Sequence, residues 1–246
     1  MKPKTSFPIG SAKMDSLRFP CDISLKEEII KRMVSVGGEG TCLRVAGDAT
    51  ILLEPRNERP RIFITGTRDI DSYGRDMIGR ILSALEDLPV KPLVLTTCSV
   101  GTSGRVIEEI LSSHPDLPLA VMMYTGFERI YPYTMTGMIE QVAERPNSAV
   151  MTMMPDGTMP TATGAIFVSE FLAAFADAVV VPECKARGSA MLAARFAHGC
   201  DTPVFAVPGR VGDSRSVGTN NLISYGVADG VWDMVEFRKK LENNFL

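Results

Sequence analysis

The sequence has only two histidines, His114 and His198, and neither has a second metal-ligating residue at the spacing of a metal site. It also lacks the phosphate-binding pattern GxxxxGK(S/T), the nucleophile pattern GxSxG and the zinc pattern HExxH. Asp69 and Asp71 lie close together, but they directly precede a helix expected near Tyr73, so we interpret them as helix-capping residues. These absences favour a binding protein over an enzyme, with no catalytic residue, metal ion or cofactor.

Cysteine is scarce and scattered, which argues against both a disulfide framework and a zinc site. No two cysteines form a CxxC pair, and their number is odd. We therefore expect reduced and mostly buried thiols at positions 21, 42, 98, 184 and 200.

Long apolar runs and an excess of basic residues are also missing. No stretch reaches the roughly 18 to 20 consecutive apolar residues of a membrane span, and no signal-peptide pattern follows the first residues. We therefore expect a cytoplasmic protein without a membrane partner. The net charge is −3, whereas nucleic-acid-binding domains are usually strongly basic. Any nucleic-acid site must then be a local basic patch.

Short apolar runs and helical patterns alternate from residue 42 onward, and 45% of all residues are hydrophobic. Strand followed by helix, repeated along the chain, predicts an α/β fold with a doubly wound, mostly parallel sheet. The expected strands span residues 42–46, 61–65, 93–97, 119–124, 149–153, 178–181 and 203–207, and the expected helices span 73–88, 103–113, 135–145, 165–175 and 189–199.

The two ends of the chain differ from this repeating pattern. Residues 1–40 are expected to form an arm with one short helix at 25–36, separated by a glycine-rich stretch from a domain spanning residues 41–246. The last residues predict a short charged helix anchored by Trp232 packed against the domain.

Two strand-to-helix loops carry residues suited to binding a phosphate, because ligands of such sheets sit at the carboxyl ends of the strands. Each loop alone also fits an ordinary turn with exposed bases, so the prediction depends on the two together. In the first, glycine allows close approach of the backbone and an arginine supplies fixed donors. In the second, Ser189 is expected to cap a helix beside two bases. The candidate residues are Gly66, Thr67, Arg68, Lys185, Arg187, Gly188 and Ser189.

A third loop, residues 207–221, is too long and too glycine-rich for a plain connection, and long ordered loops at strand ends are often functional. Between Glu183 and Arg215 there are five Lys or Arg residues against three Asp or Glu, a local basic excess on an acidic chain. The candidate phosphate-binding residues of this loop are Gly209, Arg210, Ser216, Gly218 and Asn220.

Together these loops resemble the DprA/Smf family of DNA-processing proteins, collinearly from about residue 42 to 227. The segment Gly66-Thr67-Arg68 followed by Tyr73-Gly74 resembles the family's G(S/T)R and YG motif, and Ile130-Tyr131-Pro132 resembles its central YP. The most specific match is at residues 204–209 and 216–223, which read VFAVPG and SVGTNNLI.

The resemblance implies an extended Rossmann-like domain that binds single-stranded DNA in a basic pocket, forms a homodimer and helps to load a RecA-type recombinase during DNA uptake. In place of the family's RNR motif this chain has Val168-Ser169-Glu170, which predicts weaker binding of the polymer. The family's flanking helical and winged-helix domains have no counterpart in the sequence. The alternative is a related Rossmann-like protein that binds or hydrolyses free nucleotides, such as a Lonely Guy-type phosphoribohydrolase or a nucleotide sensor, although Pro208-Gly209-Arg210 lacks the glycine pattern of those hydrolases.

Overall fold

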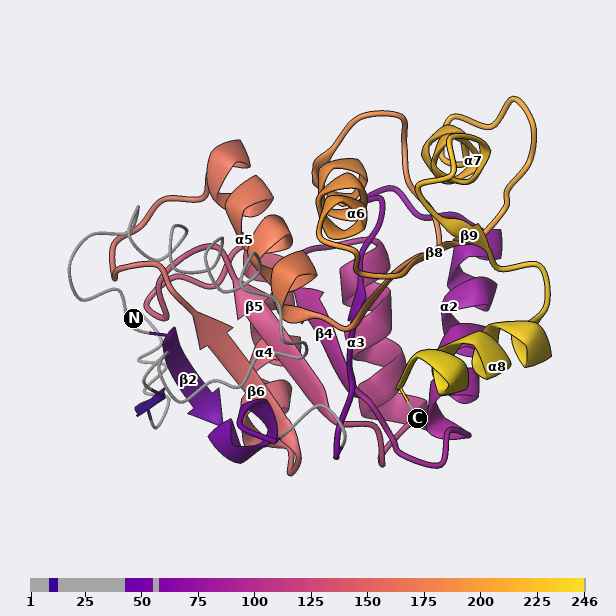
Figure 1. Cartoon of the computed structure of the whole chain (residues 1–246). Helices are drawn as coiled ribbons and strands as arrows, with labels where there is room; N and C mark the ends of the chain where they lie inside the picture. Colours follow the sequence, from indigo (N-terminus) through magenta and orange to yellow (C-terminus); the bar gives the residue numbers. More distant parts are fainter. Residues whose placement is uncertain (1–8, 13–42, 55–57, 246) are drawn as a thin grey trace.

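The described strands form one sheet of nine, of which the central part is parallel (Figure 1). A computed structural model describes residues 9–12, 43–54 and 58–245. The order across the sheet is β1-β2-β6-β5-β4-β3-β7-β8-β9. The strands are β1 (Ile9–Ala12), β2 (Leu43–Gly47), β3 (Arg61–Ile64), β4 (Leu93–Thr97), β5 (Leu119–Met123), β6 (Ser148–Thr152), β7 (Ala178–Val181), β8 (Val204–Ala206) and β9 (Asp229–Gly230).

Helices cover both faces of the sheet, so the predicted doubly wound Rossmann-like fold is confirmed. One face packs against α5 (Ala162–Phe175), α6 (Ser189–Gly199) and α7 (Val217–Ser224). The other packs against α2 (Ser72–Glu86), α3 (Thr102–Ser113), α4 (Thr136–Glu144) and α8 (Met234–Phe245). Two short 3-10 helices, η2 (Ala49–Leu52) and η3 (Tyr133–Met135), complete the described elements.

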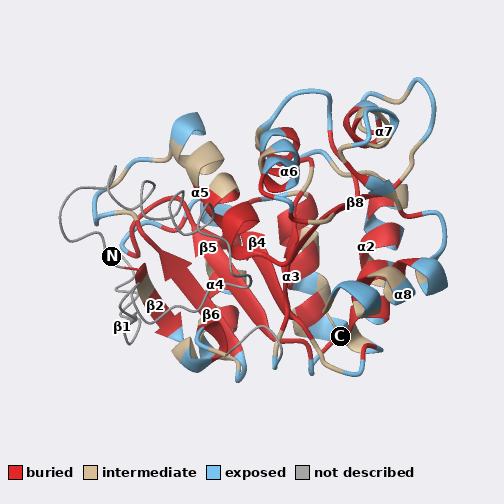
Figure 2. Ribbon diagram, in the orientation of Figure 1, coloured by how far each residue is buried: buried red, intermediate tan, exposed pale blue. Residues whose placement is uncertain are grey.

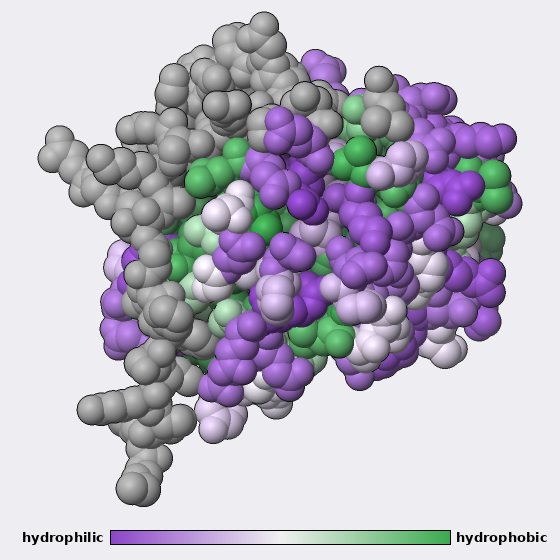
Figure 3. Space-filling model, turned by 90° about the horizontal axis from the view of Figure 1, so that it is seen from below, coloured by the Kyte–Doolittle hydropathy of each residue, from purple (hydrophilic) through white to green (hydrophobic). Residues whose placement is uncertain are grey.

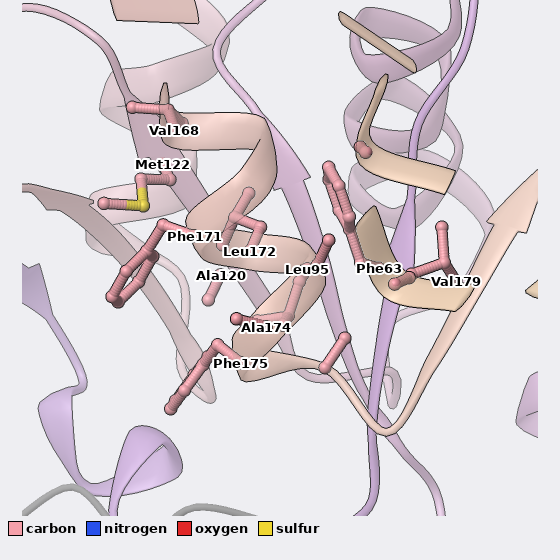
Figure 4. Close-up of a cluster of buried hydrophobic side chains, with 14 of the residues drawn as sticks. Phe63, Leu95, Ala120, Met122, Val168, Phe171, Leu172, Ala174, Phe175 and Val179 are labelled. Atoms are coloured by element: carbon pink, nitrogen blue, oxygen red, sulfur yellow. The ribbon is translucent and has the colours of Figure 1, made fainter. Parts of the chain in front are cut away.

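The central strands are mostly apolar and are buried at every position, because both of their faces are covered. Successive residues of a strand point to opposite faces, and in β3 Phe63 packs toward α5 whereas Ile62 and Ile64 pack toward α2. Figure 4 shows the first of these cores, where Phe63 lies between Leu95 of β4 and Val179 of β7. In Figure 2 the central strands are red and exposed residues gather on the loops and outer helix faces.

The edge of the sheet opposite the strand-end loops is seen in Figure 3. Its described surface is mostly hydrophilic, with smaller hydrophobic areas between the polar ones. Ion pairs such as Lys91–Asp116, 2.9 Å long, lie where the strands begin. None of the described helices is long and apolar enough to cross a membrane.

One end of the sheet is antiparallel, within a fold that the sequence predicted to be mostly parallel. β2 runs antiparallel to β6, and β1, inside the expected arm, pairs antiparallel with β2. The helix expected at 25–36 lies outside the described residues, and the division at residue 41 stays a prediction. The third loop ends earlier than expected, because residues from Val217 onward form α7.

Trp232 does not anchor the C-terminal helix, contrary to the prediction. Its side chain is 70% exposed. Phe237 and Leu241, which are four residues apart and therefore on one face of α8, are buried instead. Phe237 packs edge-on against Phe205 of β8, with 5.3 Å between the ring centroids.

Candidate phosphate-binding site

The first two candidate loops meet where the strand order reverses. From β3 the chain proceeds through β4 and β5 on one side, and it returns to β7 on the other. β3 and β7 are therefore hydrogen-bonded neighbours, paired in parallel from Ile62 with Ala178 to Ile64 with Val180. Their carboxyl ends lie side by side, which brings the loops at 65–71 and 182–188 together at the position where ligands of doubly wound sheets bind.

A cavity of about 460 Å³ lies between these loops and the helices α5 and α6. All seven candidates from the first two loops line it, as does Asp69. The rest of the lining is Ala162, Ala165, Ile166, Cys184, Ala190, Met191 and Leu192. The volume is within the range of small-ligand sites.

Gly66 allows the first loop to pack tightly against its neighbours. A Cβ atom at this position would lie 2.4 Å from the Thr102 hydroxyl oxygen and 2.5 Å from the Glu183 carbonyl oxygen. The Thr67 N–H donates to that same carbonyl at 2.8 Å, and the Thr67 hydroxyl accepts from the Asp69 N–H at 3.1 Å. Gly66 and Thr67 therefore fix the loop, and Arg68 is left exposed on it.

Gly188, rather than the expected Ser189, is the N-cap residue of α6. Its φ angle of 142° lies in the region that favours glycine, and Ser189 becomes the first residue of the helix. No side chain caps α6. The amides of its first turn remain available to an anion, which the helix dipole also attracts.

The cavity is electropositive. Its charged lining residues are Arg68, Lys185 and Arg187, against the single acid Asp69. Asp69 binds Lys185 at 3.1 Å and contacts Arg215 at 3.5 Å. Two effects hold the pKa of Asp69 below its usual value. The hydrogen bond from Lys185 is the larger, and the positive charge of Arg215 is the next. Arg68 and Arg187 are both exposed, and neither has an ion-pair partner among the described residues. Their charges are the ones available to a ligand.

The third loop packs beside the cavity but does not line it. The Asn220 side chain accepts from the Gly209 N–H at 3.0 Å and donates to the Gly209 carbonyl at 3.2 Å. Ser216 is buried against Gly209. These three residues stabilise the loop itself, and Arg210 is exposed on it. As DNA contacts they stay predictions.

Contacts join the third loop to the other two. The Gly218 N–H donates to the Cys184 carbonyl at 2.9 Å, and a Cβ on Gly218 would lie 2.4 Å from the Cys184 sulfur. The Tyr73 hydroxyl donates to the Pro208 carbonyl at 2.9 Å. The three loops are thus held together as one surface at the carboxyl edge of the sheet.

Sequence reasoning missed the apolar wall of the cavity. Ala162, Ala165 and Ile166 of α5 face Met191 and Leu192 of α6 across it, and the two helices lie side by side over the sheet (Figure 1). The available signal was the composition of α5, which is apolar on nearly every face although only one face is needed for the core.

The residues at the RNR position do not reach this wall. Val168 and Ser169 are buried, and burial raises the pKa of the half-buried Glu170. In this chain, therefore, the cavity's basic side chains come from the loops and not from α5.

The structure also describes a capping aspartate, three of the cysteines and the side chains that could bind a metal ion. Asp71 caps α2, since its carboxylate accepts from the Gly74 N–H at 2.9 Å. The described cysteines, Cys98, Cys184 and Cys200, are all buried, as expected. Among the described residues no three His, Cys, Asp or Glu side chains are placed to hold a metal ion.

The sequence matches the family of DNA recombination-mediator protein A over residues 31–242. The chain belongs to this family. DNA processing protein A from Helicobacter pylori, studied for its binding of single-stranded DNA, superimposes with a TM-score of 0.75 at 18% identity, covering 98% of this chain and 99% of that one. The Streptococcus pneumoniae protein gives 0.73 at 18% identity, with 94% and 73% covered.

More distant structures share only the general architecture. A molybdenum cofactor carrier protein from Chlamydomonas reinhardtii superimposes with a TM-score of 0.50 at 10% identity, covering 76% of this chain and 98% of that one. No curated protein matches the chain in sequence. Membership of the DNA recombination-mediator family gives the chain a role in DNA processing.

Proposed function

We propose that this chain binds single-stranded DNA at the cavity between the β3 and β7 loops and acts by binding alone. The observation that carries the proposal is the convergence of Arg68 and Arg187 on one cavity. They come from different strands, 119 positions apart, and neither is neutralised by a described carboxylate. Beside them the uncapped start of α6 supplies further donors for a phosphate.

The two sides of the cavity match the two parts of a nucleotide. Guanidinium groups and backbone amides hold phosphates without reading sequence. The opposite wall, formed by residues such as Ile166 and Leu192, offers apolar surface to a base. A cavity of about 460 Å³ can receive a base only if it is unpaired, because the bases of a duplex are stacked inside it. The site therefore favours single strands.

Single-stranded oligonucleotides should bind more tightly than duplexes of the same length, and the affinity should fall as salt rises. With two or three phosphates neutralised by Arg68, Arg187 and Lys185, the slope of log K against log salt should be about −1.4 to −2.1. Fluorescence anisotropy titrations at several salt concentrations measure both quantities. Equal affinity for duplex, or a slope near zero, would contradict polymer binding.

The alternative is that the cavity holds a free nucleotide, because a phosphate site beside an apolar wall also suits a mononucleotide. Adding a mononucleotide arm to the same titration separates the two. A mononucleotide that binds as tightly as an oligonucleotide would favour the nucleotide-binding alternative. Appearance of free base on incubation would further indicate a phosphoribohydrolase.

The family resemblance also suggests a homodimer that acts in the cytoplasm with a RecA-type recombinase during natural transformation. In support of an association surface, large apolar side chains are exposed near the β9 edge of the sheet, at Tyr225, Trp232 and Val235.

Light scattering at micromolar concentration should give twice the monomer mass, because exposed aromatic groups near a sheet edge gain from being covered. Trp232→Ser should shift the mass toward that of the monomer. Leu192→Ser, an exposed apolar site on α6 away from this edge, is the matched control. A monomer mass for the unaltered protein would overturn the dimer.

A further inference from the structure

A pair of tyrosines lies beyond Arg68 along the carboxyl edge of the sheet. Tyr124 directly follows β5, and Tyr131 belongs to the connection from β5 to η3. Arg68 follows β3, and only β4 separates these two strands. Neighbouring strands are about 4.8 Å apart, so β3 and β5 are about 10 Å apart.

The ring of Tyr131 is both exposed and held in place. It is 43% exposed, and its edge-to-face contact with Tyr124 has a centroid distance of 6.1 Å and an interplanar angle of 76°. The Cys98 thiol, at the end of β4, donates to the Tyr131 carbonyl at 3.4 Å. A ring that is fixed from behind and open in front can stack on a flat partner with little loss of side-chain entropy.

The hydroxyl of Tyr124 is buried without a partner. The residue is 4% exposed, and its hydroxyl has no hydrogen-bond partner among the described residues. Burial raises the pKa of Tyr124 to about 12, and the charge of Arg68 acts in the opposite direction. The guanidinium is therefore within electrostatic range of this hydroxyl. Buried polar groups are nearly always paired, so an unpaired one beside a cation indicates a missing acceptor.

We propose that Tyr131, Tyr124 and Arg68 form a second subsite, in which Tyr131 stacks on a base of the bound strand and the Tyr124 hydroxyl donates to an acceptor on the same nucleotide. The inference rests on the proposed binding of single-stranded DNA and extends it. Arg68 belongs to both subsites, so the strand leaves the cavity past Arg68 and runs over β4 toward β5.

The first test removes the stacking ring. Tyr131→Ala should weaken binding of a single-stranded oligonucleotide roughly 5- to 150-fold, as expected for one base–aromatic stack. It should leave binding of an abasic oligonucleotide of equal length within about twofold of the unaltered protein, since no base is present to stack. Tyr131→Phe, which keeps the ring at the same position, is the matched control and should change neither affinity.

The second test removes the hydroxyl alone. Tyr124→Phe should raise the thermal midpoint of the free protein, because the variant no longer buries an unpaired polar group. The same change should weaken oligonucleotide binding roughly 3- to 10-fold, because the donor to the nucleotide is lost. A hydroxyl that only fills space would raise stability and leave the affinity unchanged.

The outcomes separate this inference from the proposed function. If the unaltered protein binds no oligonucleotide, the proposed function itself fails. If it binds, and Tyr131→Ala behaves like Tyr131→Phe on both ligands, cavity binding stands and the second subsite is wrong. A loss on the abasic ligand equal to that on the normal one would also overturn base stacking.

Discussion

Replacing Arg68 or Arg187 by alanine should weaken single-stranded DNA binding by on the order of 1 to 3 kcal/mol in each case, the scale of a charged hydrogen bond. Both guanidinium groups line the cavity and are exposed, so the losses should come from the ligand and not from the fold. The thermal midpoint of either variant should therefore hardly move. Anisotropy titrations and thermal unfolding measure the two effects independently.

The double variant tests whether the two arginines share a ligand. Groups that contact one phosphate or neighbouring phosphates are coupled, so the combined loss should be smaller than the sum of the single losses. Arg195→Ala provides the control, because Arg195 is exposed on α6 but does not line the cavity. Strict additivity would indicate two separate sites. Unchanged binding in both single variants would place the ligand elsewhere.

The buried carboxyl group of Glu183 should make the stability of the protein depend on pH. The residue is 2% exposed and follows β7. One carboxyl oxygen accepts from the Asp71 N–H at 3.2 Å, and the other has no partner among the described residues. Burial raises the pKa of Glu183 from 4.5 to about 7. The folded state therefore binds this proton more tightly than the unfolded state.

The sign of the effect follows from that difference in proton binding. The stability that protonated Glu183 contributes is fully present below pH 4.5, the pKa of this group in the unfolded chain. It is lost as the pH rises through about 7, the pKa in the folded protein. Glu183→Gln keeps a carbonyl acceptor for Asp71 but cannot ionise. Relative to the unaltered protein, its free energy of unfolding should rise by about 3 kcal/mol between about pH 4 and pH 8.

Urea unfolding of the two proteins across this pH range measures the Glu183 effect directly. Glu144→Gln, an exposed site on α4, is the control and should show no such trend. If the difference between Glu183→Gln and the unaltered protein is the same at every pH, Glu183 does not titrate in this window, and the carboxyl group has a partner that removes the cost of its charge.

Most of the fold could be predicted from the sequence because the central strands are buried on both faces. Runs such as 93–97 and 178–181 have no polar alternation, and the predicted bounds match the strands. The direction of β2 could not be predicted, since strand pairing depends on partners far away in the chain. The helix α7 was hidden because residues 217–221 read VGTNN, which includes poor helix formers, so tertiary packing decides its conformation.

The sequence could predict the part of the site that lies on the loops after the strands. The positions of Arg68 and Arg187 followed from the alternation of strands and helices, and the structure brings them to one cavity. Asp69 was expected to act as a helix cap, and its contacts with Lys185 and Arg215 instead depend on how the three loops pack. The cavity's apolar wall depends on the orientation of α5 against α6, and the apolar composition of α5 indicates an extra buried face without indicating what covers it.

The pairing of β3 with β7 determines the separation of the two arginine loops. Backbone hydrogen bonds set this distance, and they do not depend on which side chains the strands carry. The segment between the two strands can therefore vary in sequence without moving one loop relative to the other, as long as β3 and β7 stay paired. A chain with 18% identity to the Helicobacter pylori protein can keep the same overall fold. Its ligand preference can then change through the helices that close the cavity, while the distance between the two loops stays constant.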